Sequence, residues 1–561
     1  MSKWRDNNTS PETFADFTEI KMGIRHATFH QEVRQDLSLW IKLFEQFLSS
    51  TSSDTLKRYI TYEIAVASLR GKGSMLGQED RLRAYFSIIP ELTSSKDIED
   101  TAILATYCTG AIANSAVEMS SEEVQLLKKS LSDRIDEILA NTKNIGYKCS
   151  LLETQGGLCL DPLRFKTIDA AIETAFNKWD ELLNLVDHAP LFPLERFSDR
   201  LTNLIAIIGS HPLYHSFTRK VDEHLSKRYG GFIAAEKCRD RALAFYDKGD
   251  LLNAIKELHQ AKIDWFAEET LKGSLLAMLL LSQWYTAMGL AYAGKHYALA
   301  VAYISAFSVN ENVKSFIPRG LAAAAESDYS AGAWWSYLDL SEIALKGHGH
   351  YSPNPDDIEK HHFFQNILFS TTIIMHITSQ LDEALYKAIK ERVDKWEMSD
   401  IIDPLLEEAK KSWSSLTKEK IWETLEEQLH GKPFNDLGQM RTVTWLASGI
   451  TWSVSWENTY EKTAVTEQFI SALQILSVDL TDVDLCLLKS DVVLEIDLHD
   501  SLPKAEPVDE NKERRWKVHL PNQVAQEKLS IDDFNAYVLA TAVQILSDAS
   551  LLPEKEMDKA L

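Results

Sequence analysis

The sequence ALAFYDKGDLLNAIKELHQA, residues 242–261, places a tight turn between two helical patterns. Gly249 ends the first pattern, because glycine adopts the positive backbone angles at which helices commonly terminate. In the second pattern, Ala254, Leu258 and Ala261 fall on one face of a helix. Small residues on that face let two antiparallel helices approach closely, so the stretch predicts a helical hairpin of the kind that stacks into repeats.

Two further hairpins are expected downstream of the first. The second runs from Met288–Tyr292 through Gly294 to Val301, and the third joins Leu321–Ala325 to Trp334–Leu345. Together the three units resemble tetratricopeptide repeats (TPRs) over about residues 232–346. The resemblance implies a superhelix that holds a peptide or helix of another protein in a concave groove.

The TPR-like pattern is irregular. The first unit has Cys238 where the family favours Trp, and Phe266 where it favours Pro. The residue numbers of the corresponding Ala254 and Ala300 differ by 46, whereas the family's period is roughly 34 residues. We therefore expect irregular TPR-like repeats. The alternative is an ordinary packing of antiparallel helices, which uses the same glycine turns and alanine contacts.

Periodicity along the chain predicts a mainly α protein with a small C-terminal α+β module. Residues 450–457, ITWSVSWE, alternate apolar and polar side chains as a half-buried strand does, and so do residues 492–498 and 516–520. Helices are expected at 462–477 and 531–548. This interpretation divides the chain into N-terminal helices at 1–160, the TPR-like region at 161–346, a helical connector at 347–440 and the α+β module at 441–561.

The composition narrows the function classes. In 561 residues, 83 Asp and Glu outnumber 59 Lys and Arg, for a formal net charge of −24. This excess repels phosphate backbones and argues against extended nucleic-acid contact. The five cysteines form no CxxC pair, so neither a disulfide framework nor a structural zinc site is expected, and a reducing cytoplasm fits. The polar first residues predict no secretion signal.

One stretch is long and apolar enough to consider as a membrane span. Residues 275–294 carry no formal charge over twenty positions. Polar residues in its middle, Ser282 and Gln283 among them, would be costly in lipid. We therefore expect a buried core helix and no contact with a membrane.

Three groups of ionisable residues are candidates for chemistry. The first group has side chains that can coordinate a metal cation, although their spacing matches no standard metal site: His348, His350, Asp356, Asp357, His361 and His362. Its alternative is a polar loop at 347–360. The second group consists of carboxylates near the predicted sheet: Glu457, Glu461, Glu467 and Asp497. They could bind a metal or act as acid and base, and the alternative is that they are solvated surface residues. A third set of carboxylates is similar to an acidic metal-binding loop but lacks the glycine and the terminal glutamate of a calcium loop: Asp479, Asp482 and Asp484.

Nucleophiles and phosphate loops have weaker support. Cys108 and Cys238 lie in apolar helical patterns, where a thiol is usually a core residue. The motifs of phosphate-binding loops, dinucleotide sites and hydrolase nucleophile elbows do not occur in the sequence. No catalytic residue, metal or cofactor is therefore predicted.

Aromatic and basic side chains of the TPR-like region are the predicted partner-binding residues. The aromatic side chains are Trp265, Trp284, Trp334, Trp335 and Tyr337. They could anchor a partner in the groove, and the alternative is that they fill gaps between helices. Polar contacts to an acidic or carboxylate-ended peptide are expected from Arg239, Lys256 and Lys262, with Arg241 beside them.

The sequence thus favours a scaffold or adaptor that binds a partner protein or peptide, alone or as part of a larger complex. The alternative is a sensor or effector subunit of a prokaryotic stress or defence system. In that case a hydrolase or nuclease activity would lie in the C-terminal module or in a partner.

Overall fold

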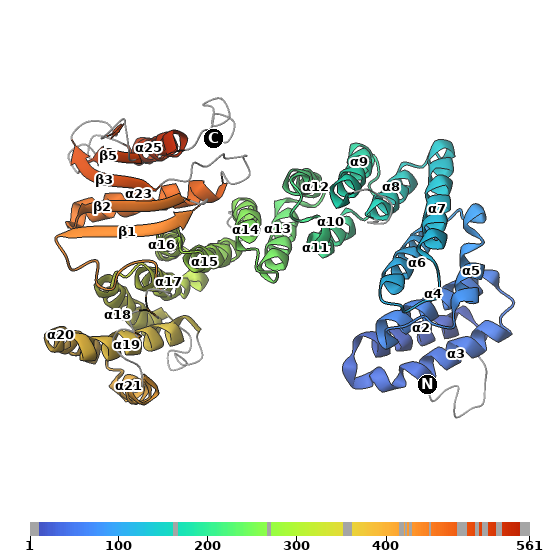
Figure 1. Cartoon of the computed structure of the whole chain (residues 1–561), viewed down its shortest axis with the longest axis horizontal. Coiled ribbons are helices and arrows are strands. Elements are labelled where there is room, and N and C mark those ends of the chain that lie inside the picture. Colours follow the sequence, from blue (N-terminus) through green and yellow to red (C-terminus); the bar gives the residue numbers. More distant parts are fainter. Residues whose placement is uncertain are drawn as a thin grey trace. The chain divides into compact units, whose positions relative to one another are not determined.

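The computed structural model of the chain describes residues 11–160, 167–265, 271–351, 362–413, 420, 423, 425, 429–447, 450–479, 491–499, 504–507, 514–522 and 530–549. Contacts divide the chain into two compact units, Met1–Arg228 and Tyr229–Leu561 (Figure 1). This division differs from the expected four regions. Residues 161–228 group with the N-terminal helices, whereas the connector and the α+β module share one unit with the helical hairpins.

The described residues of the N-terminal unit form helices joined by turns and loops, with no strand among them. Its elements are α2 (Phe14–Phe29), η1 (Gln31–Asp36), α3 (Leu37–Ser50), α4 (Asp54–Lys72), α5 (Glu79–Phe86), η2 (Ile89–Glu91), α6 (Ser95–Ala113), α7 (Ser121–Asn141), α8 (Ile145–Cys159), α9 (Ile168–Val186), α10 (Leu194–Asn203), α11 (Ile205–Ile208) and α12 (Leu213–Tyr229). Side chains at the N-termini cap several of these helices. Ser120 accepts from the Glu123 amide at 3.0 Å, while the Glu123 carboxylate pairs with Arg83.

Helix α8 covers a glycine-containing stretch that local preference alone would place in a loop. Helix α8 runs through Gly156 and Gly157, although glycine disfavours helix interiors. The reason is tertiary: a Cβ on Gly156 would lie 2.2 Å from the indole Nε1 of Trp179, so only glycine lets α9 pack this closely. The buried Trp179 indole donates to the Glu153 carbonyl at 3.2 Å and fixes the contact.

Six helices form a stack of three hairpins in the C-terminal unit. They are α13 (Gly231–Tyr246), α14 (Leu251–Trp265), α15 (Leu271–Ala287), α16 (Ala291–Phe307), α17 (Phe316–Ser330) and α18 (Trp334–Tyr351), with η4 (Glu311–Val313) before α17. Each helix packs against the next along the chain, and α15 also contacts α17.

The three hairpin turns share one hydrogen-bonding pattern. Gly249, Gly289 and Gly332 have φ of 77°, 82° and 75°. The next residue in each turn donates its amide to a carbonyl five positions earlier: Asp250 to Phe245 at 3.0 Å, Leu290 to Tyr285 at 2.9 Å, and Ala333 to Asp328 at 2.9 Å. This is the Schellman arrangement that ends a helix at a left-handed glycine. The predicted hairpin at Gly249 is therefore present.

The second turn lies earlier than predicted. It is formed at Gly289, whereas Gly294 lies inside α16. A Cβ on Gly294 would lie 2.2 Å from the Thr286 hydroxyl, so this glycine serves close helix packing and not chain reversal. The uncharged stretch 275–294 is consequently split between two helices. Among the residues that the structure describes, no helix combines the length and apolarity needed to cross a membrane.

The connector continues the helical part of this unit. Its elements are α19 (His362–Leu381), α20 (Glu383–Val393), η6 (Asp394–Trp396) and α21 (Ser399–Trp413). Helix α18 extends to Tyr351, so the loop expected from residue 347 is wrong at its start. A shared core of Trp334, Tyr337, Leu338 and Phe364 joins the third hairpin to α19.

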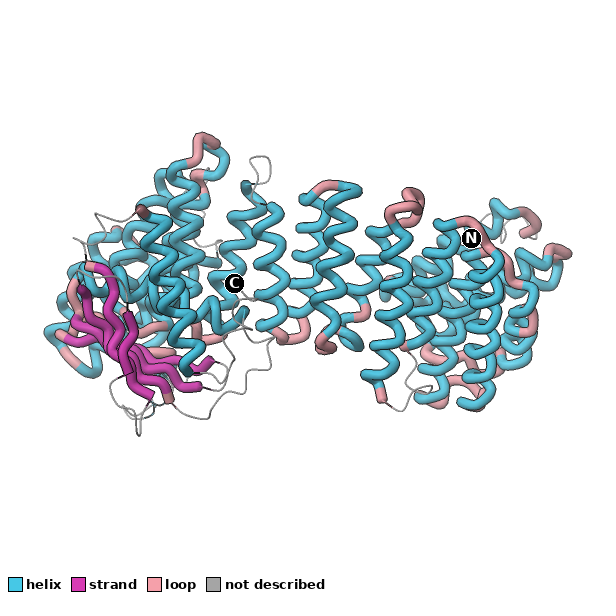
Figure 2. The backbone as a smooth tube through the Cα atoms, turned by 90° about the horizontal axis from the view of Figure 1, so that it is seen from above, coloured by secondary structure: helices cyan, strands magenta, loops and turns pink. Residues whose placement is uncertain are grey.

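The C-terminal module is a five-stranded mixed sheet with two helices, as the predicted fold class requires. Its elements are β1 (Met440–Ala447), β2 (Ile450–Glu457), α23 (Tyr460–Asp479), β3 (Val492–His499), β4 (Lys504–Pro507), β5 (Arg514–Pro521) and α25 (Ile531–Ala549). The strand order is β1-β2-β3-β5-β4, with β2, β3 and β5 parallel and both edge strands antiparallel. Figure 2 shows the strands as one sheet set against helices of the same unit.

Two strands were not predicted from the sequence. β1 has the required alternation, but Arg441 occupies one of its buried positions and breaks the apolar pattern. β4 is four residues long and ends in Pro507, a residue that edge strands tolerate. Strands β2, β3 and β5 and helices α23 and α25 agree with the predicted ranges within a few residues.

We expect the hairpin turns to differ in their tolerance of a side chain. Gly249→Ala should lower the free energy of unfolding by about 1–2 kcal/mol, because alanine disfavours positive φ. No steric clash adds to this loss, since a Cβ at Gly249 meets no atom within 4 Å. Gly332→Ala should cost more, since its Cβ would also lie 2.3 Å from the Lys432 carbonyl oxygen. Calorimetric Tm values of the two variants test this order. Equal losses would mean that the turn at Gly332 is not packed as described.

Candidate functional site

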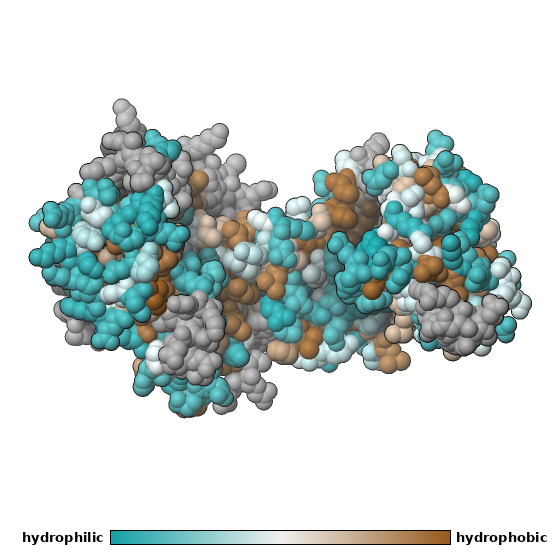
Figure 3. All heavy atoms as spheres, turned by 90° about the horizontal axis from the view of Figure 1, so that it is seen from below, coloured by the Kyte–Doolittle hydropathy of each residue, from teal (hydrophilic) through white to brown (hydrophobic). Residues whose placement is uncertain are grey.

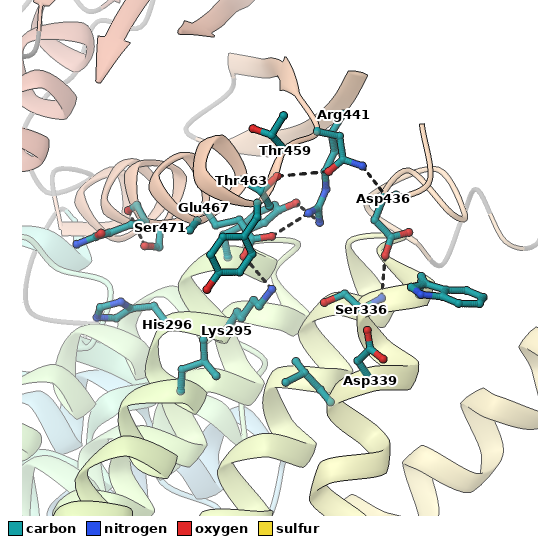
Figure 4. Close-up of a pocket in the computed structure, with 18 of the residues that line it drawn as sticks. Lys295, His296, Ser336, Asp339, Asp436, Arg441, Thr459, Thr463, Glu467 and Ser471 are labelled. Atoms are coloured by element: carbon teal, nitrogen blue, oxygen red, sulfur yellow. Dashed lines mark hydrogen bonds and ion pairs between the residues drawn. The ribbon is translucent and has the colours of Figure 1, made fainter. Parts of the chain in front are cut away.

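The C-terminal unit contains a cleft of about 960 Å³. Helices α16, α18 and α23 form its walls, and the segment that leads into β1 closes one end (Figure 4). This volume lies at the upper end of the roughly 300–1,000 Å³ typical of ligand pockets. Its lining residues include Lys295, His296, Leu299, Tyr303, Trp335, Ser336, Asp339, Asp436, Arg441, Asn458, Tyr460, Thr463, Glu467 and Gln468.

A network of buried charges forms the floor of the cleft. The Lys295 ammonium on α16 lies 2.8 Å from Asp328 on α17 and 2.8 Å from Glu467 on α23. The other Glu467 oxygen accepts from the Arg441 guanidinium of β1 at 2.9 Å. Arg441 also donates to the Tyr292 hydroxyl at 3.2 Å. In Figure 4 the Lys295 and Glu467 side chains point toward each other across the floor.

The network holds its members in defined charge states. Burial opposes ionisation of Glu467, but the charges of Lys295 and Arg441 outweigh it and lower the pKa of the carboxyl. Burial also opposes charge on Lys295, and the two carboxylates outweigh it and raise the pKa of the ammonium. Burial dominates at Asp328 and raises the pKa of its carboxyl. Glu467 is therefore the firmly ionised centre of the network.

Two further contacts fasten the module to the hairpin stack. The Gln474 side chain of α23 accepts from the Ala293 amide at 2.8 Å. That amide belongs to the first turn of α16, where the helix offers no partner of its own. The Arg441 guanidinium lies 5.3 Å from the centre of the Trp456 ring and 6.0 Å from that of Tyr292. The Gln474 contact positions α23 on α16, and the Arg441 contact with Tyr292 holds β1 against the same helix.

The segment before β1 anchors on the third hairpin turn. The His430 amide donates to the Ser330 carbonyl at 2.8 Å, and the Asn435 side chain donates to the Ala331 carbonyl at 2.6 Å. Asp436 then accepts from the Ser336 amide at 2.8 Å. Burial raises the pKa of the Asp436 carboxyl above its ordinary value, against the opposing effect of that amide. Asp436 is thus fixed at the edge of the cleft.

The mouth of the cleft is apolar and aromatic, unlike its floor. Leu299 and Tyr303 of α16 are 39% and 66% exposed, and Tyr460 at the start of α23 is 93% exposed. Trp335 of α18 is half-buried, and the Arg392 guanidinium lies 4.9 Å from the centre of its ring. The molecular face drawn in Figure 3 is mostly hydrophilic, with hydrophobic residues gathered in separate patches. Exposed rings on a largely polar surface are a feature of interaction sites.

Of the four predicted aromatic anchors whose side chains the structure describes, only Trp335 lines the cleft. Trp334 is fully buried and stacks on Tyr329 at 5.6 Å, and Tyr337 donates to the Ile367 carbonyl at 2.6 Å. Trp284 is 4% exposed and stacks on Tyr246. These three rings fill space between helices, so the predicted groove of exposed rings is corrected to a packed interior at these positions.

The predicted basic residues lie on the first hairpin, apart from the cleft lining. Arg239 pairs with Glu236 at 2.7 Å and Asp240 at 3.0 Å, and Lys256 is half-buried on α14. Arg241 is buried and bonds Glu257 at 2.9 Å, joining α13 to α14. It is therefore a packing residue and not a contact for a partner. The side chains of Lys262 and Trp265 lie outside the described residues.

The candidate carboxylates do not form one group. Glu457 and Asp497 both pair with Lys462, at 3.1 and 3.0 Å, whereas Glu467 belongs to the buried network. His348 packs against the Phe364 ring at 4.5 Å. Asp356, Asp357, His361, Asp482 and Asp484 lie outside the described residues, as does the side chain of Asp479. Within the described part of the chain, no three His, Cys, Asp or Glu residues are grouped to hold a metal ion.

Cys108 and Cys238 are buried in helices, as expected for core thiols. Burial raises the pKa of the Cys108 thiol to about 12, which disfavours the reactive thiolate. Cys149 and Cys159 are also buried, and burial raises the pKa of Cys149 to about 11.

The buried network was largely missed by sequence reasoning, which singled out Glu467 alone. A usable signal exists in hindsight: Lys295 is the only Lys, Arg, Asp or Glu between Lys272 and Glu311. A lone charge in so long an apolar stretch requires a buried partner, because an unpaired buried charge is very costly. The partners Asp328 and Glu467 lie up to 172 positions away in sequence, so they could not be identified by spacing.

Comparison of the chain with known protein families, with curated proteins and with solved structures finds no match.

Removing the central carboxylate should destabilise the C-terminal unit strongly. Glu467→Gln leaves Lys295 and Arg441 short of a counter-charge in a buried site, which should cost about 3–5 kcal/mol. The matched control Glu457→Gln removes a carboxylate that is 58% exposed and should change stability by only about 0.5 kcal/mol. Calorimetry on both variants measures the difference. Similar Tm shifts would contradict a buried network.

The difference in stability between the native chain and Glu467→Gln should depend on pH. Because the folded-state pKa of Glu467 is lowered, its contribution is complete above the ordinary value of 4.5 and is lost as pH falls through the lower folded value. The stability gap between the native chain and Glu467→Gln should therefore narrow only below about pH 4.5. A gap that narrowed between pH 8 and 6 would contradict this assignment. Thermal melts at a series of pH values test it.

Proposed function

We propose that this chain is an interaction adaptor that binds a segment of a partner protein in the cleft between α16, α18 and α23. The observation that carries the proposal is the combination of an apolar, aromatic mouth with a floor whose charges already satisfy one another. Paired floor charges fix the shape of the cleft, while exposed rings supply contact area at low entropic cost. Such a site is suited to recognition.

The helical hairpins support the same proposal. Three hairpins with matching turns provide a rigid stack, and stacked hairpins of the TPR-like kind commonly present binding surfaces. The predicted concave groove is replaced in this proposal by the cleft on the side of α16 and α18. Arg239 and Lys256 on the first hairpin remain candidates for outer contacts to the same partner.

A catalytic effector is the less favoured function. Its predicted carboxylates Glu457 and Asp497 are engaged by one lysine, Lys462. The Ser336 hydroxyl in the cleft donates to Asp328 at 2.7 Å, and the other oxygen of Asp328 pairs with Lys295. These groups are therefore committed to structure, which favours an adaptor.

Site-specific photo-crosslinking tests the proposal. A benzophenone amino acid at Tyr303, which is 66% exposed at the cleft mouth, should crosslink one protein in an extract of the source cells. The matched control is Phe369 of α19, which is 64% exposed and lies outside the cleft lining. We expect the Tyr303 product to be absent at Phe369. Equal labelling at both positions, or none at Tyr303, would reject the cleft as a protein-binding site.

A further inference from the structure

The structure already contains one helix docked on α16. Helix α23 lies along the N-terminal half of α16, held by Glu467 on Lys295 and by Gln474 on the Ala293 amide. The pair forms a helix-on-helix interface within the chain. The continuation of this face toward the C-terminus of α16 is not covered in the same way.

The exposed fraction of the side chains along one face of α16 rises toward the C-terminus of the helix. Lys295, Leu299, Tyr303 and Phe307 are four positions apart and share one face of the helix. The Lys295 side chain beneath α23 is 12% exposed, whereas Leu299, Tyr303 and Phe307 are 39%, 66% and 75% exposed. The helix-binding face of α16 therefore continues past the end of its internal partner as an apolar, open surface.

A second stripe on α18 forms the opposite wall. Trp335, Asp339 and Ile343 are again four positions apart, with Trp335 half-buried and Ile343 54% exposed. Helix α23 contributes Tyr460, Thr463 and Glu467 at helical spacing to the third wall. The open space is thus bounded on three sides by ridges of helical side chains, the surface into which another helix packs.

The walls also distinguish a helix from an extended peptide. An extended segment gains affinity by pairing its backbone with a free strand edge. The three long walls here are helices, whose backbone groups are bonded within the helix. At the end that leads into β1, the Asp436 and Gly438 carbonyls already accept from the Asn458 side chain, at 2.7 and 3.0 Å. A helix satisfies its own backbone and needs only side-chain contacts, so it suits this cleft better.

Charge selects the kind of helix. The floor charges Lys295, Arg441 and Glu467 satisfy one another, which leaves Asp339, whose side chain is 47% exposed, as an accessible carboxylate of the described lining. Asp339 and Trp335 already bind a guanidinium of the same chain: Arg392 forms an ion pair with Asp339 and lies over the Trp335 ring. The net charge of the whole chain, −24, favours the approach of a basic partner over an acidic one.

We propose that the cleft binds a basic amphipathic helix of the partner protein, with its apolar face on Leu299 and Tyr303 and its Lys or Arg side chains beside Asp339. This inference rests on the proposed adaptor function and adds the chemistry of the bound segment. It extends the existing α16–α23 interface by one further helix.

Selection from a peptide library tests the inference without knowledge of the partner. The full-length chain is used to select displayed 20-residue peptides of random sequence. We expect enriched peptides to show apolar residues at positions i, i+3, i+4 and i+7 and an excess of Lys and Arg. Tyr303→Ala should weaken their binding by roughly tenfold or more, and Phe369→Ala should leave it unchanged. Asp339→Asn should reduce the excess of basic residues.

The other outcomes separate the two proposals. Enrichment of extended, proline-rich or acidic peptides that still depend on Tyr303 would overturn the basic helix and leave the adaptor function standing. Peptides that bind the native chain and Tyr303→Ala equally would overturn the proposed docking site. If the selection enriches nothing and Tyr303 crosslinks no protein, both proposals fail. Circular dichroism of each variant confirms that the exposed substitutions leave the fold intact.

Discussion

The carboxylate of Glu467 connects three parts of the C-terminal unit that are distant in sequence. It accepts from Lys295 of the hairpin stack and from Arg441 of the sheet, while itself belonging to α23. A buried charge is tolerated only when it is paired, so α16, β1 and α23 can reach low energy only together. The cleft exists because this network holds α23 against one half of α16 and leaves the other half open.

Buried ion pairs add little net stability compared with apolar packing, but they are demanding in geometry. We interpret the network as a device that fixes how the module sits on the hairpins. Asp328 contributes to that role: it engages both Lys295 and the Ser336 hydroxyl, and so ties α17 and α18 to the same centre. A defined floor beneath an apolar mouth gives a preorganised site, which reduces the entropic cost of binding.

Sequence patterns predicted local structure well and long-range assembly poorly. The hairpin at Gly249 and strand β2 follow from turn chemistry and alternation within a few residues of the chain. The second turn was misplaced because Gly294 serves close packing against Thr286 and Ser327, while the chain reverses at Gly289. For the same reason Trp334 and Tyr337 could not be assigned to core or surface, since burial is decided by the helices that cover them.

Hydrogen exchange of the native chain and Glu467→Gln tests most directly whether one carboxylate couples the three elements. If it does, amides at the start of α16, in β1 and in α23 should all exchange faster in the variant, while those of residues 11–228 remain unchanged. Faster exchange confined to α23, or no change at all, would contradict the account. The cleft would then have to be held by contacts other than the Glu467 network.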